Sequence, residues 1–560
     1  MPTLHRPAPS SPPTRRAASL LAAGAFALAG IAGPSVGHAQ VKPSNAVGTM
    51  IATPGAQKQV SFAIGPRTDL PGSTLTVRVY PFDDVGKPLH DPVVTLRRKL
   101  AGNGTGETAN LAVNVPRAGL YRVEAEVTTG SGAPAGDAAR GATTLAFVTP
   151  RTSVGASDWG VVTHFGQGGQ PPSVVLPLVK QAGFSWIRDE LYWQEVEKTP
   201  NVFTFPARYD DYIAQTAKFG ISPLIVLDYG NPSAYPQLFA SSQFPDNDAT
   251  RELFVHYVQA VVKHYGNTVK TWEVWNEPNF GQIGYDNYLA LLKDTYAAIK
   301  KLSPDSTVIS CGGGGTGGGP GADCLWALMQ RGGLDAQDGF SVHPYMPPNP
   351  PETGYKGKGG PIESVSIPST WPYLKQLVAA HPRSDGKQLQ VWITELGWPV
   401  NPQVPGQDEA TQAANLARSY LLSRRYSAVR VLFWYDFIDD GNDLHNFEFN
   451  FGLLHHDLTP KPAFVASSVL STTLGNRAFN KALVDSADVK AWQYGSGNDT
   501  MIAGWTVGPD ERTATLNLPA GRYVMRDWQG AETPVTVTNQ PYSWRVGPLP
   551  RYLVPVQTAQ

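Results

Sequence analysis

Apolar and polar residues alternate along the part of the chain that follows residue 40. The runs 74–80, 109–115 and 120–127 place an apolar side chain at every second position, and turn-rich stretches such as 101–106 separate them. This period of two is typical of β-strands that bury one face. We therefore predict an N-terminal β-sandwich domain of the Ig-like type over residues 40–150.

Between residues 151 and 475 the pattern changes to short apolar runs that alternate with helical segments. The clearest helical segments are 207–219, 250–265, 285–302, 409–425 and a closing helix at 462–474. The apolar runs, each suited to a buried strand, are 159–164, 184–190, 221–229, 269–277, 307–311, 339–343, 389–395 and 429–436. Repeated strand–helix units over this length predict an α/β fold, a (β/α)₈ TIM barrel.

Strand patterns return after residue 475. They cover 488–494, 499–507, 512–518, 522–527 and 533–537. We predict a C-terminal β-domain over residues 476–560 that packs on the barrel. The alternative is that these strands complete a single sandwich with the N-terminal strands.

The first 39 residues have the features of a targeting segment. Arg15 and Arg16 precede an apolar stretch, 17–32, and small residues at 37–39 offer a cleavage site. Because this stretch is short and rich in Ala and Gly, we predict a signal peptide over residues 1–39 and export to the periplasm or the medium. The route is Sec, or twin-arginine given the basic pair. No later segment reaches the length of a membrane span.

Composition and charge narrow the class of partner. With 41% hydrophobic and 16% charged residues, the chain is that of a folded globular protein. Its formal net charge is −1, so there is no electrostatic case for binding nucleic acid. These numbers leave the oligomeric state open.

The two cysteines, Cys311 and Cys324, flank a glycine-rich run at 312–320. For an exported chain we favour a disulfide between them over two buried thiols. Two cysteines alone do not make a zinc site. Gly313, Gly315 and Gly318 satisfy a dinucleotide-binding spacing, but any polyglycine tract would do so. We therefore expect neither a metal nor an organic cofactor.

Two of the predicted barrel strands end on a glutamate. The fourth closes with Asn276 and Glu277, and the seventh with Thr394 and Glu395. Burying a charge costs several kcal/mol unless it is paired or used. The carboxyl ends of barrel strands share one mouth, and strands four and seven face each other across it. A facing pair of carboxylates at such a mouth is typical of a glycosidase.

These strand ends resemble a known group of enzymes. Residues 275–278 (Trp-Asn-Glu-Pro) and 394–397 (Thr-Glu-Leu-Gly) match the paired signatures of clan A retaining glycoside hydrolases. Over residues 153–475 the chain most resembles glycoside hydrolase family 39, in its bacterial exopolysaccharide-hydrolase branch rather than among the β-xylosidases. The runs 186–197 and 228–231 carry this closer resemblance, while Arg188, His343, Tyr345 and Trp434 at the other strand ends agree with the clan.

The resemblance implies a role for each of the strand ends. Glu277 is expected to be the general acid/base and Glu395 the nucleophile, with the two carboxyl groups about 5 Å apart. Asn276 is expected to bind the sugar 2-hydroxyl, which requires an irregular strand end because neighbours in a strand point to opposite faces. Arg188 and Tyr345 are expected to hold Glu395 in its ionised form.

Further candidates surround this pair. His343, His164 and Trp398 are expected to contact the sugar, and Trp434 is expected to form the floor of the sugar-binding subsite. Glu273, inside strand four, is expected to be a structural partner of Arg188 rather than a catalytic group. The long segments 346–361 and 437–451, which follow strands six and eight, are expected to form walls at the mouth.

Together these features predict an exported, retaining glycoside hydrolase that cleaves β-glycosidic bonds within a bacterial exopolysaccharide. Its partner would be a polysaccharide or oligosaccharide substrate. An exo-acting β-xylosidase-like enzyme or a transglycosylase is the alternative among enzymes. A non-catalytic glycan-binding protein on a barrel scaffold is the alternative from another class, although a retired site has no reason to keep Glu277, Glu395 and Arg188. A serine-hydrolase reading fails because no G-x-S-x-G nucleophile elbow appears in the predicted domains, the one match, at 33–37, lying in the predicted signal peptide.

Overall fold

The computed structural model describes residues 41–44, 49–66, 72–101, 105–129, 139–239, 243–278, 283–314, 322–357 and 362–556. The predicted signal peptide, residues 1–39, lies outside this part of the chain, as do Gly315 and Gly318 of the glycine run. Among the helices described, none combines the length and the apolar character that a membrane span needs.

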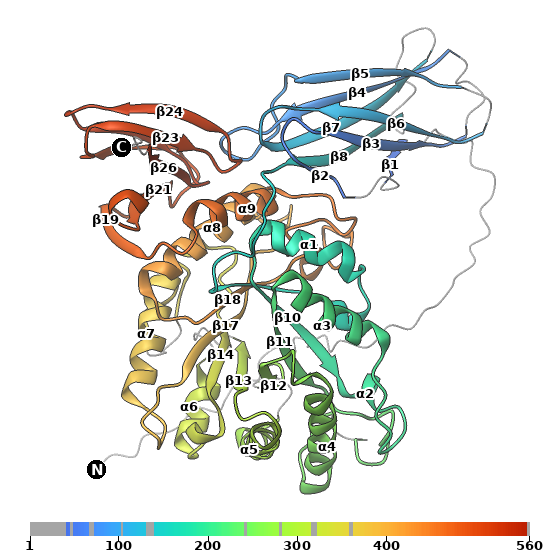
Figure 1. Cartoon of the computed structure of the whole chain (residues 1–560), viewed down its shortest axis with the longest axis vertical. Helices are drawn as coiled ribbons and strands as arrows, with labels where there is room; N and C mark the ends of the chain where they lie inside the picture. The colour runs from blue at the N-terminus through green and yellow to red at the C-terminus, as the bar shows by residue number, and fades with distance from the viewer. Residues whose placement is uncertain are drawn as a thin grey trace, which may run out of the picture.

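The N-terminal strands form a sandwich of two sheets (Figure 1). One sheet has the order β1 (Val41–Pro43), β3 (Gln57–Ile64), β6 (Glu107–Asn114). The other has the order β2 (Ile51–Ala52), β8 (Arg140–Phe147), β7 (Gly119–Thr128), β4 (Thr74–Pro81), β5 (Val94–Lys99). Alternate residues such as Val60, Val77 and Val123 are fully buried in one core, as the period of two predicts.

The middle of the chain folds into a closed barrel of parallel strands, which confirms the predicted TIM barrel. In barrel order the strands are β9 (Trp159–Val162), β10 (Trp186–Tyr192), β11 (Ser222–Asp228), β12 (Thr271–Val274), β13 (Thr307–Gly314), β14 (Gly339–His343), β17 (Gln390–Leu396) and β18 (Leu432–Trp434). A short hairpin of β15 (Tyr355–Lys356) and β16 (Ser364–Val365) is inserted after β14.

Helices surround the barrel. They are α1 (Pro172–Ala182), α2 (Trp193–Val196), α3 (Ala207–Phe219), α4 (Asp248–Tyr265), α5 (Tyr285–Leu302), α6 (Asp323–Gln330), α7 (Ile367–Ala380), α8 (Glu409–Tyr426) and α9 (Pro462–Leu474). Short 3₁₀ turns lie at η2 (Phe165–Gln167), η3 (Leu334–Ala336) and η4 (Phe447–Phe449). Helix α4 begins two residues before the predicted start because Asn247 caps it, accepting a hydrogen bond from the Thr250 backbone at 3.1 Å.

The C-terminal strands form sheets of their own. A six-stranded sheet has the order β19 (Phe479–Asp485), β20 (Val489–Tyr494), β21 (Met501–Thr506), β26 (Arg551–Pro555), β23 (Gly521–Arg526), β24 (Glu532–Val537), and β22 (Arg512–Leu516) pairs with β25 (Tyr542–Val546). Within the described residues none of these strands pairs with an N-terminal strand, which rules out the alternative of a shared sandwich. The edge strand β19 escaped prediction because it buries no continuous apolar face.

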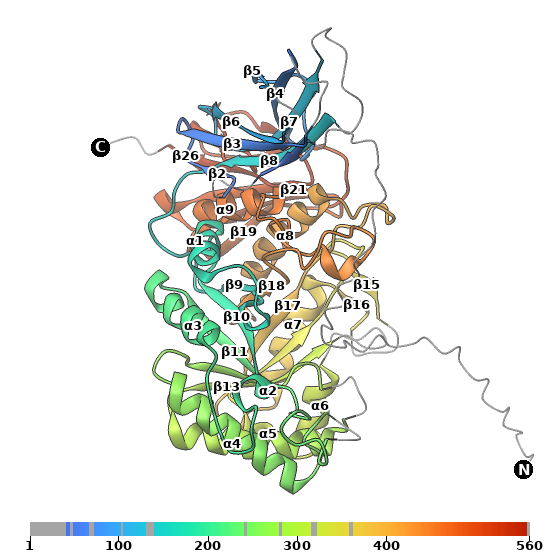
Figure 2. The same cartoon turned by 90° about the vertical axis from the view of Figure 1, so that its right-hand side faces the viewer.

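Both β-domains lie on the side of the barrel that carries α1, α8 and α9 (Figures 1 and 2). Thr144 of the sandwich donates to the Pro460 carbonyl just before α9, at 2.6 Å. Arg526 of the C-terminal sheet donates to Thr473 of α9 at 2.8 Å. The two β-domains also contact each other, because Gln529 donates to the Phe82 carbonyl at 2.9 Å. Both β-domains are therefore hydrogen-bonded to the barrel, at or next to α9.

Candidate active site

The barrel interior is built in layers by alternate residues of its strands. The rings of Trp186 and Trp392 meet edge to face at 5.6 Å and belong to an apolar cluster inside the barrel. Two residues further along the same strands come Arg188 and Thr394, which are buried and polar. The aromatic layer thus excludes water from one side of a polar layer that lies at the carboxyl ends of the strands.

Glu273 occupies the centre of this polar layer. Its carboxylate accepts hydrogen bonds from Arg188 Nε at 2.6 Å, from Ser341 Oγ at 2.5 Å and from Thr394 Oγ1 at 2.9 Å. It is fully buried, and its oxygens are occupied by these donors. The prediction that Glu273 is a structural partner of Arg188 is confirmed.

The strand ends above this layer are irregular. The register between β17 and β18 shifts between Ile393 and Leu396, so an extra residue turns Glu395 into the mouth instead of outward. Strand β12 ends at Val274 rather than at the predicted Glu277, because Trp275 and Glu277 have positive φ angles of 67° and 47°. Non-glycine residues in this conformation are strained and cluster at functional sites. This irregularity brings Asn276 and Glu277 to the same mouth.

Glu395 is held by a different donor on each oxygen. Arg188 donates to Oε1 at 2.8 Å, and the Tyr345 hydroxyl donates to Oε2 at 2.8 Å. Burial alone would raise the pKa of Glu395, but the positive charges of His343 and Arg188 and the hydrogen bond from Tyr345 outweigh it and lower that pKa. The carboxyl group is therefore kept ionised.

Arg188 contacts three acidic or polar groups at once. Besides Glu273 and Glu395 it donates to Asn276 Oδ1 at 2.9 Å, and Asn276 in turn donates to the Tyr229 hydroxyl at 3.3 Å. Burial would lower the pKa of Arg188, but the neighbouring carboxylates raise it well above its ordinary value. Asn276 is therefore fixed beside the carboxylate pair by contacts on both ends of its amide.

A chain of hydrogen bonds leads from Glu277 into the polar layer. Glu277 Oε1 lies 3.0 Å from His343 Nδ1, and His343 Nε2 lies 2.9 Å from Thr394 Oγ1. Since the single Thr394 hydroxyl hydrogen is donated to Glu273, Nε2 of His343 must be the donor to Thr394. One further proton is then shared between Nδ1 and the Glu277 carboxyl group. His343 thus orients Glu277 and can hold its proton.

Glu277 and Glu395 face each other at short range. One carboxylate oxygen of each, together with a ring nitrogen of His343, lies within 4.8 Å of the other two atoms. The carboxyl groups of retaining glycosidases lie about 5–5.5 Å apart, whereas inverting enzymes need about 6.5–9.5 Å to admit a water molecule between them. The spacing therefore suits direct attack by one carboxylate and protonation by the other.

His164 lies at the edge of the mouth. Its Nδ1 is 2.8 Å from Asp440 and 3.8 Å from Asp436. Burial would lower the pKa of His164, but the two aspartates raise it to about 10, so the ring is a cation at neutral pH. Its charge is one of those that lower the pKa of Glu395. His164, predicted only as a sugar contact, therefore also favours the ionised form of Glu395 through its charge.

The expected roles of Trp398 and Trp434 need correction. Their rings stack at 5.7 Å and are 1% and 0% exposed, so neither offers a face to a sugar. Phe433 in β18 and Tyr435 directly after it point inward, and Trp434 between them points outward. The half-buried Tyr435 ring lies 6.2 Å from Tyr345. Sequence reasoning missed Tyr435, although counting by twos from Phe433 would have found it.

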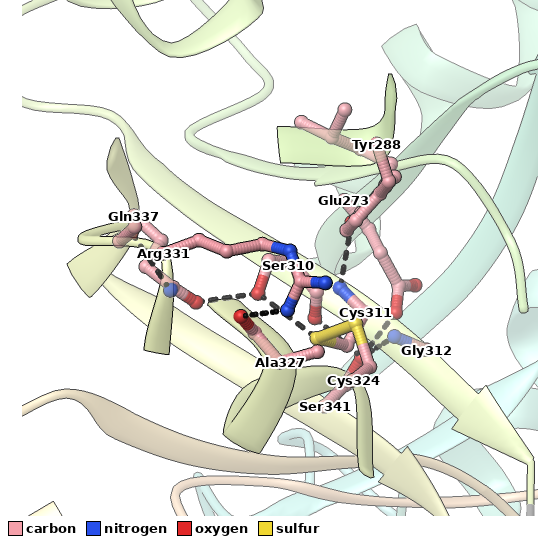
Figure 3. Close-up of a disulfide and its surroundings, with 12 residues drawn as sticks. Glu273, Tyr288, Ser310, Cys311, Gly312, Cys324, Ala327, Arg331, Gln337 and Ser341 are labelled. Atoms are coloured by element: carbon pink, nitrogen blue, oxygen red, sulfur yellow. Dashed lines mark hydrogen bonds between the residues drawn. A yellow bond between two sulfur atoms is a disulfide. The ribbon is translucent and has the colours of Figure 1, made fainter. Parts of the chain in front are cut away.

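A disulfide lies directly behind the site (Figure 3). Cys311 within β13 is bonded to Cys324 in α6, with 5.9 Å between the Cα atoms. The backbone of Cys311 donates to the Tyr288 hydroxyl at 2.7 Å, and that hydroxyl donates to the Val274 carbonyl at 2.8 Å. Tyr288 therefore ties the disulfide-bearing strand to the strand that leads to Glu277.

Two groups of side chains among the described residues place three possible metal ligands together. They are Glu277, His343 and Glu395, and His164, Asp436 and Asp440. In each group the ring nitrogen already contacts a carboxylate, at 3.0 Å for His343 and 2.8 Å for His164. We assign no metal to either group.

The chain was compared with protein families, curated proteins and solved structures. No protein-family model matches the chain, and no curated protein matches it. A solved structure of a family 39 glycoside hydrolase from the gut symbiont Bacteroides cellulosilyticus WH2 is 34% identical, with a TM-score of 0.79, and the match covers 92% of this chain and 100% of that one. A GH30 endoxylanase from Clostridium papyrosolvens C71 shares the fold, at 12% identity and a TM-score of 0.50 over 72% of this chain and 97% of that one.

The match at 34% identity spans the barrel that carries the facing carboxylates and nearly all of the remaining chain. Its length and identity exceed what a shared barrel fold alone requires, because unrelated functions use the same fold. We conclude that this chain is a glycoside hydrolase and belongs to glycoside hydrolase family 39.

Proposed function

We propose that the protein is an exported, retaining endo-glycosidase that cleaves β-glycosidic bonds within a bacterial exopolysaccharide. The observation that carries the retaining mechanism is the approach of Glu277 and Glu395 to within 4.8 Å. The two groups also differ in their surroundings. Glu395 contacts Arg188 and Tyr345, whereas Glu277 contacts His343. This difference supports a nucleophile in Glu395 and a proton donor in Glu277.

In the first step the Glu395 carboxylate attacks the anomeric carbon while Glu277 gives its proton to the glycosidic oxygen. The bond between that carbon and oxygen breaks, the leaving sugar departs with a hydroxyl group, and a covalent glycosyl ester forms on Glu395. Asn276 is placed to bind the 2-hydroxyl of the sugar, because Arg188 and Tyr229 fix its amide beside the carboxylates.

In the second step Glu277 takes a proton from water, and the water oxygen attacks the anomeric carbon. Glu395 leaves as a carboxylate, and the sugar keeps its original configuration. While the ester exists, Glu395 carries no negative charge, so Glu277 gives up its proton more readily and acts as a base. The contact with His343 keeps Glu277 oriented through both steps.

Features around the mouth support a polymeric substrate. In the segment after β18, Leu444 and Phe447 are 48% and 50% exposed. Burial and the charges of Glu395, Asp440 and Glu277 raise the pKa of Glu448, which implies that this segment lies near the carboxylate pair. Exposed apolar side chains suit the C–H faces of sugar rings in neighbouring subsites. The exopolysaccharide follows from the resemblance to that branch of the family.

Product size tests the proposal. Wild-type protein and Glu395→Gln are incubated with the exopolysaccharide of the producing organism and with plant β-glycans, and the products are analysed by mass spectrometry. We expect oligosaccharides from the wild type and a loss of at least about 10³-fold in rate for the variant. Single sugars would replace endo by exo action, and products longer than the substrate would indicate transglycosylation. Binding without release by both proteins would favour a glycan-binding protein.

Glu277→Ala tests the acid/base role in the same assay. We expect it to retain activity on substrates with good leaving groups, and azide should restore its second step. Equal losses on all leaving groups would contradict this role. Export is tested by N-terminal sequencing of the secreted protein, which should begin near Gln40.

A further inference from the structure

A cleft of about 640 Å³ lies between the N-terminal sandwich and the barrel. One wall comes from the sandwich, with Phe82 and Lys87 in the turn after β4, Arg122 in β7 and Ala142 in β8. The opposite wall comes from the segment after β17 and the start of α8, with Val400, Pro402 and Glu409. Clefts of this size at domain interfaces are common ligand sites.

The two walls are held in place relative to each other. Gly86 has a φ of 81°, and a Cβ added there would lie 2.7 Å from Ala410 Cβ, so the turn of the sandwich packs directly on α8. The same turn is held from behind, because Trp528 donates to the Asp83 carbonyl at 3.1 Å and Arg551 contacts Asp84 at 2.9 Å. The cleft is therefore a fixed feature of the fold rather than a loose gap between domains.

The cleft and the catalytic mouth are bounded by the same segment of the chain, the one that follows β18. Asn442 lines the cleft, and Asp440, two residues earlier, contacts His164 at the mouth. Val400 also lines the cleft, and its backbone donates at 3.0 Å to Asn450 of the same segment after β18. The segment that bounds the carboxylate pair thus also bounds the cleft, which places the cleft beside the mouth.

The side chains of the cleft suit an uncharged or weakly charged glycan. Phe82 and Pro402 offer flat apolar surfaces, and Asn442 offers both hydrogen-bond donors and acceptors. The cationic Arg122 lies in the sandwich wall, and Glu409 lies in the opposite wall, where its carboxyl group contacts His455 Nε2 at 2.8 Å. With both signs present, neither wall attracts a strongly charged polymer.

We propose that this cleft is a distal glycan-binding site, in which the sandwich holds sugar units of the same chain that the barrel cleaves. The proposal rests on the proposed function, because its ligand is the part of the polysaccharide beyond the catalytic pair. The sandwich then determines how long a chain must be for efficient cleavage. This gives the N-terminal domain a role in substrate binding and ties it to endo action.

A chain-length series tests this site. Partial acid hydrolysis of the exopolysaccharide yields oligosaccharides that are separated by size, and kcat/KM is measured on each fraction. Ala142→Trp fills the cleft from an exposed position of the sandwich. We expect it to lower kcat/KM on long chains by about tenfold and to leave the shortest cleaved fractions unchanged. Thr95→Trp, also exposed but on β5 at the far edge of the same sheet, should match the wild type.

Equal effects of Ala142→Trp on short and long chains would overturn the proposal. If that variant does not fold, Lys87→Ala provides the same comparison, since it removes an exposed side chain whose loss leaves the turn backbone intact. Binding separates this inference from the proposed function. The affinity of inactive Glu395→Gln for the longest fraction is measured by calorimetry with and without Ala142→Trp. A weaker affinity supports the site, and an unchanged affinity refutes it. A wild type that cleaves no fraction refutes the proposed function instead.

Discussion

Buried charge at the site is concentrated on a few residues that share partners. Arg188 is 2% exposed and contacts Glu273, Glu395 and Asn276. Removing one partner of such a buried pair leaves an uncompensated charge and typically costs about 3–5 kcal/mol. The ion pair with Glu273 offsets part of the free-energy cost of burying Arg188. The second ion pair of the same guanidinium, with Glu395, stabilises the ionised form of that carboxyl group. Of the two carboxylates that contact Arg188, Glu273 therefore has a structural role and Glu395 a role at the site.

Tyr345→Phe should shift the pH dependence of activity. Without the hydroxyl donor to Oε2, the pKa of Glu395 rises toward or above its ordinary value. Since only the ionised form attacks, kcat/KM of the variant should fall at a higher pH than that of the wild type as the solution is acidified. The measurement is kcat/KM against pH on the substrate found by product analysis.

Tyr373→Phe is the matched control for this change. Its hydroxyl accepts a hydrogen bond from Trp326 at 2.6 Å on the outside of the barrel, so the acid limb of its profile should coincide with that of the wild type. Coincident acid limbs for Tyr345→Phe as well would show that the hydroxyl does not control the ionisation of Glu395.

At the scale of elements, the site lies where regular strands break. The register shift in β17, the positive φ angles after β12 and a second shift between Ser310 and Gly313 of β13 all occur at the mouth. Each break turns a residue that alternation would point outward toward the centre, or lets the backbone approach it. The regular parts of the strands fix where the mouth lies, and their irregular ends turn the side chains of Glu277 and Glu395 into it.

Gly312→Ala should damage activity more than stability. A Cβ there would lie 3.1 Å from Glu273 Oε1 and 3.6 Å from His343, on a backbone with a φ of 50°. We expect a cost of about 1 kcal/mol from the backbone and a fall in kcat of about tenfold or more as the polar layer shifts. Gly332→Ala is the control, because its φ is 67° but nothing lies within 4 Å of the added Cβ. Equal losses of activity in both variants would contradict a site-specific effect.

Reduction of the disulfide should lower the thermal stability of the barrel. Cys311 and Cys324 are separated by 13 residues in sequence, and closing a loop of this length stabilises the folded state by about 3 kcal/mol in the chain-entropy model. We expect a lower Tm with a reductant in calorimetry and no further change for Cys324→Ser under the same conditions. If the Tm of the wild type is the same with and without the reductant, the disulfide does not contribute to thermal stability.

At the scale of the whole molecule, the three regions are joined by buried polar contacts. Arg418 of α8 donates to the Thr506 carbonyl of the C-terminal sheet at 2.8 Å. Glu352 accepts from Trp505 of that sheet at 2.8 Å, so part of the segment predicted to wall the mouth connects to the C-terminal domain instead. Gln529 joins the two β-domains, because its amide accepts from the Leu120 backbone at 3.1 Å and donates to the Phe82 carbonyl.

Gln529→Ala should weaken this connection between the β-domains. It leaves the buried Leu120 N–H and the partly buried Phe82 carbonyl without this partner, which costs about 2 kcal/mol. In calorimetry we expect the wild type to unfold in one transition, and the variant to show a broader or split transition in which the sandwich unfolds first. Gln540→Ala, at an exposed position, should leave the transition unchanged. An unaltered transition for Gln529→Ala would mean that the domains are coupled elsewhere.

Local patterning was sufficient for much of the architecture. Strand β14 and helices α3, α5 and α9 have the bounds that periodicity predicted, because their apolar spacing is a property of neighbouring residues. The same holds for Glu277 and Glu395, since a charged residue that closes an apolar run is visible in the sequence without any contact. The family resemblance rested on these short motifs.

Contacts between distant residues decided the rest. Whether Trp434 or Tyr435 points into the barrel depends on the register of β18 against its neighbours, and the inward turn of Glu395 depends on a shift in β17. The hydrogen-bond chain from Glu277 through His343 and Thr394 to Glu273 joins three strands. The cleft beside the mouth exists only because the sandwich packs on α8. Such features arise from the closing of the barrel and the docking of domains, and no window of sequence contains both partners.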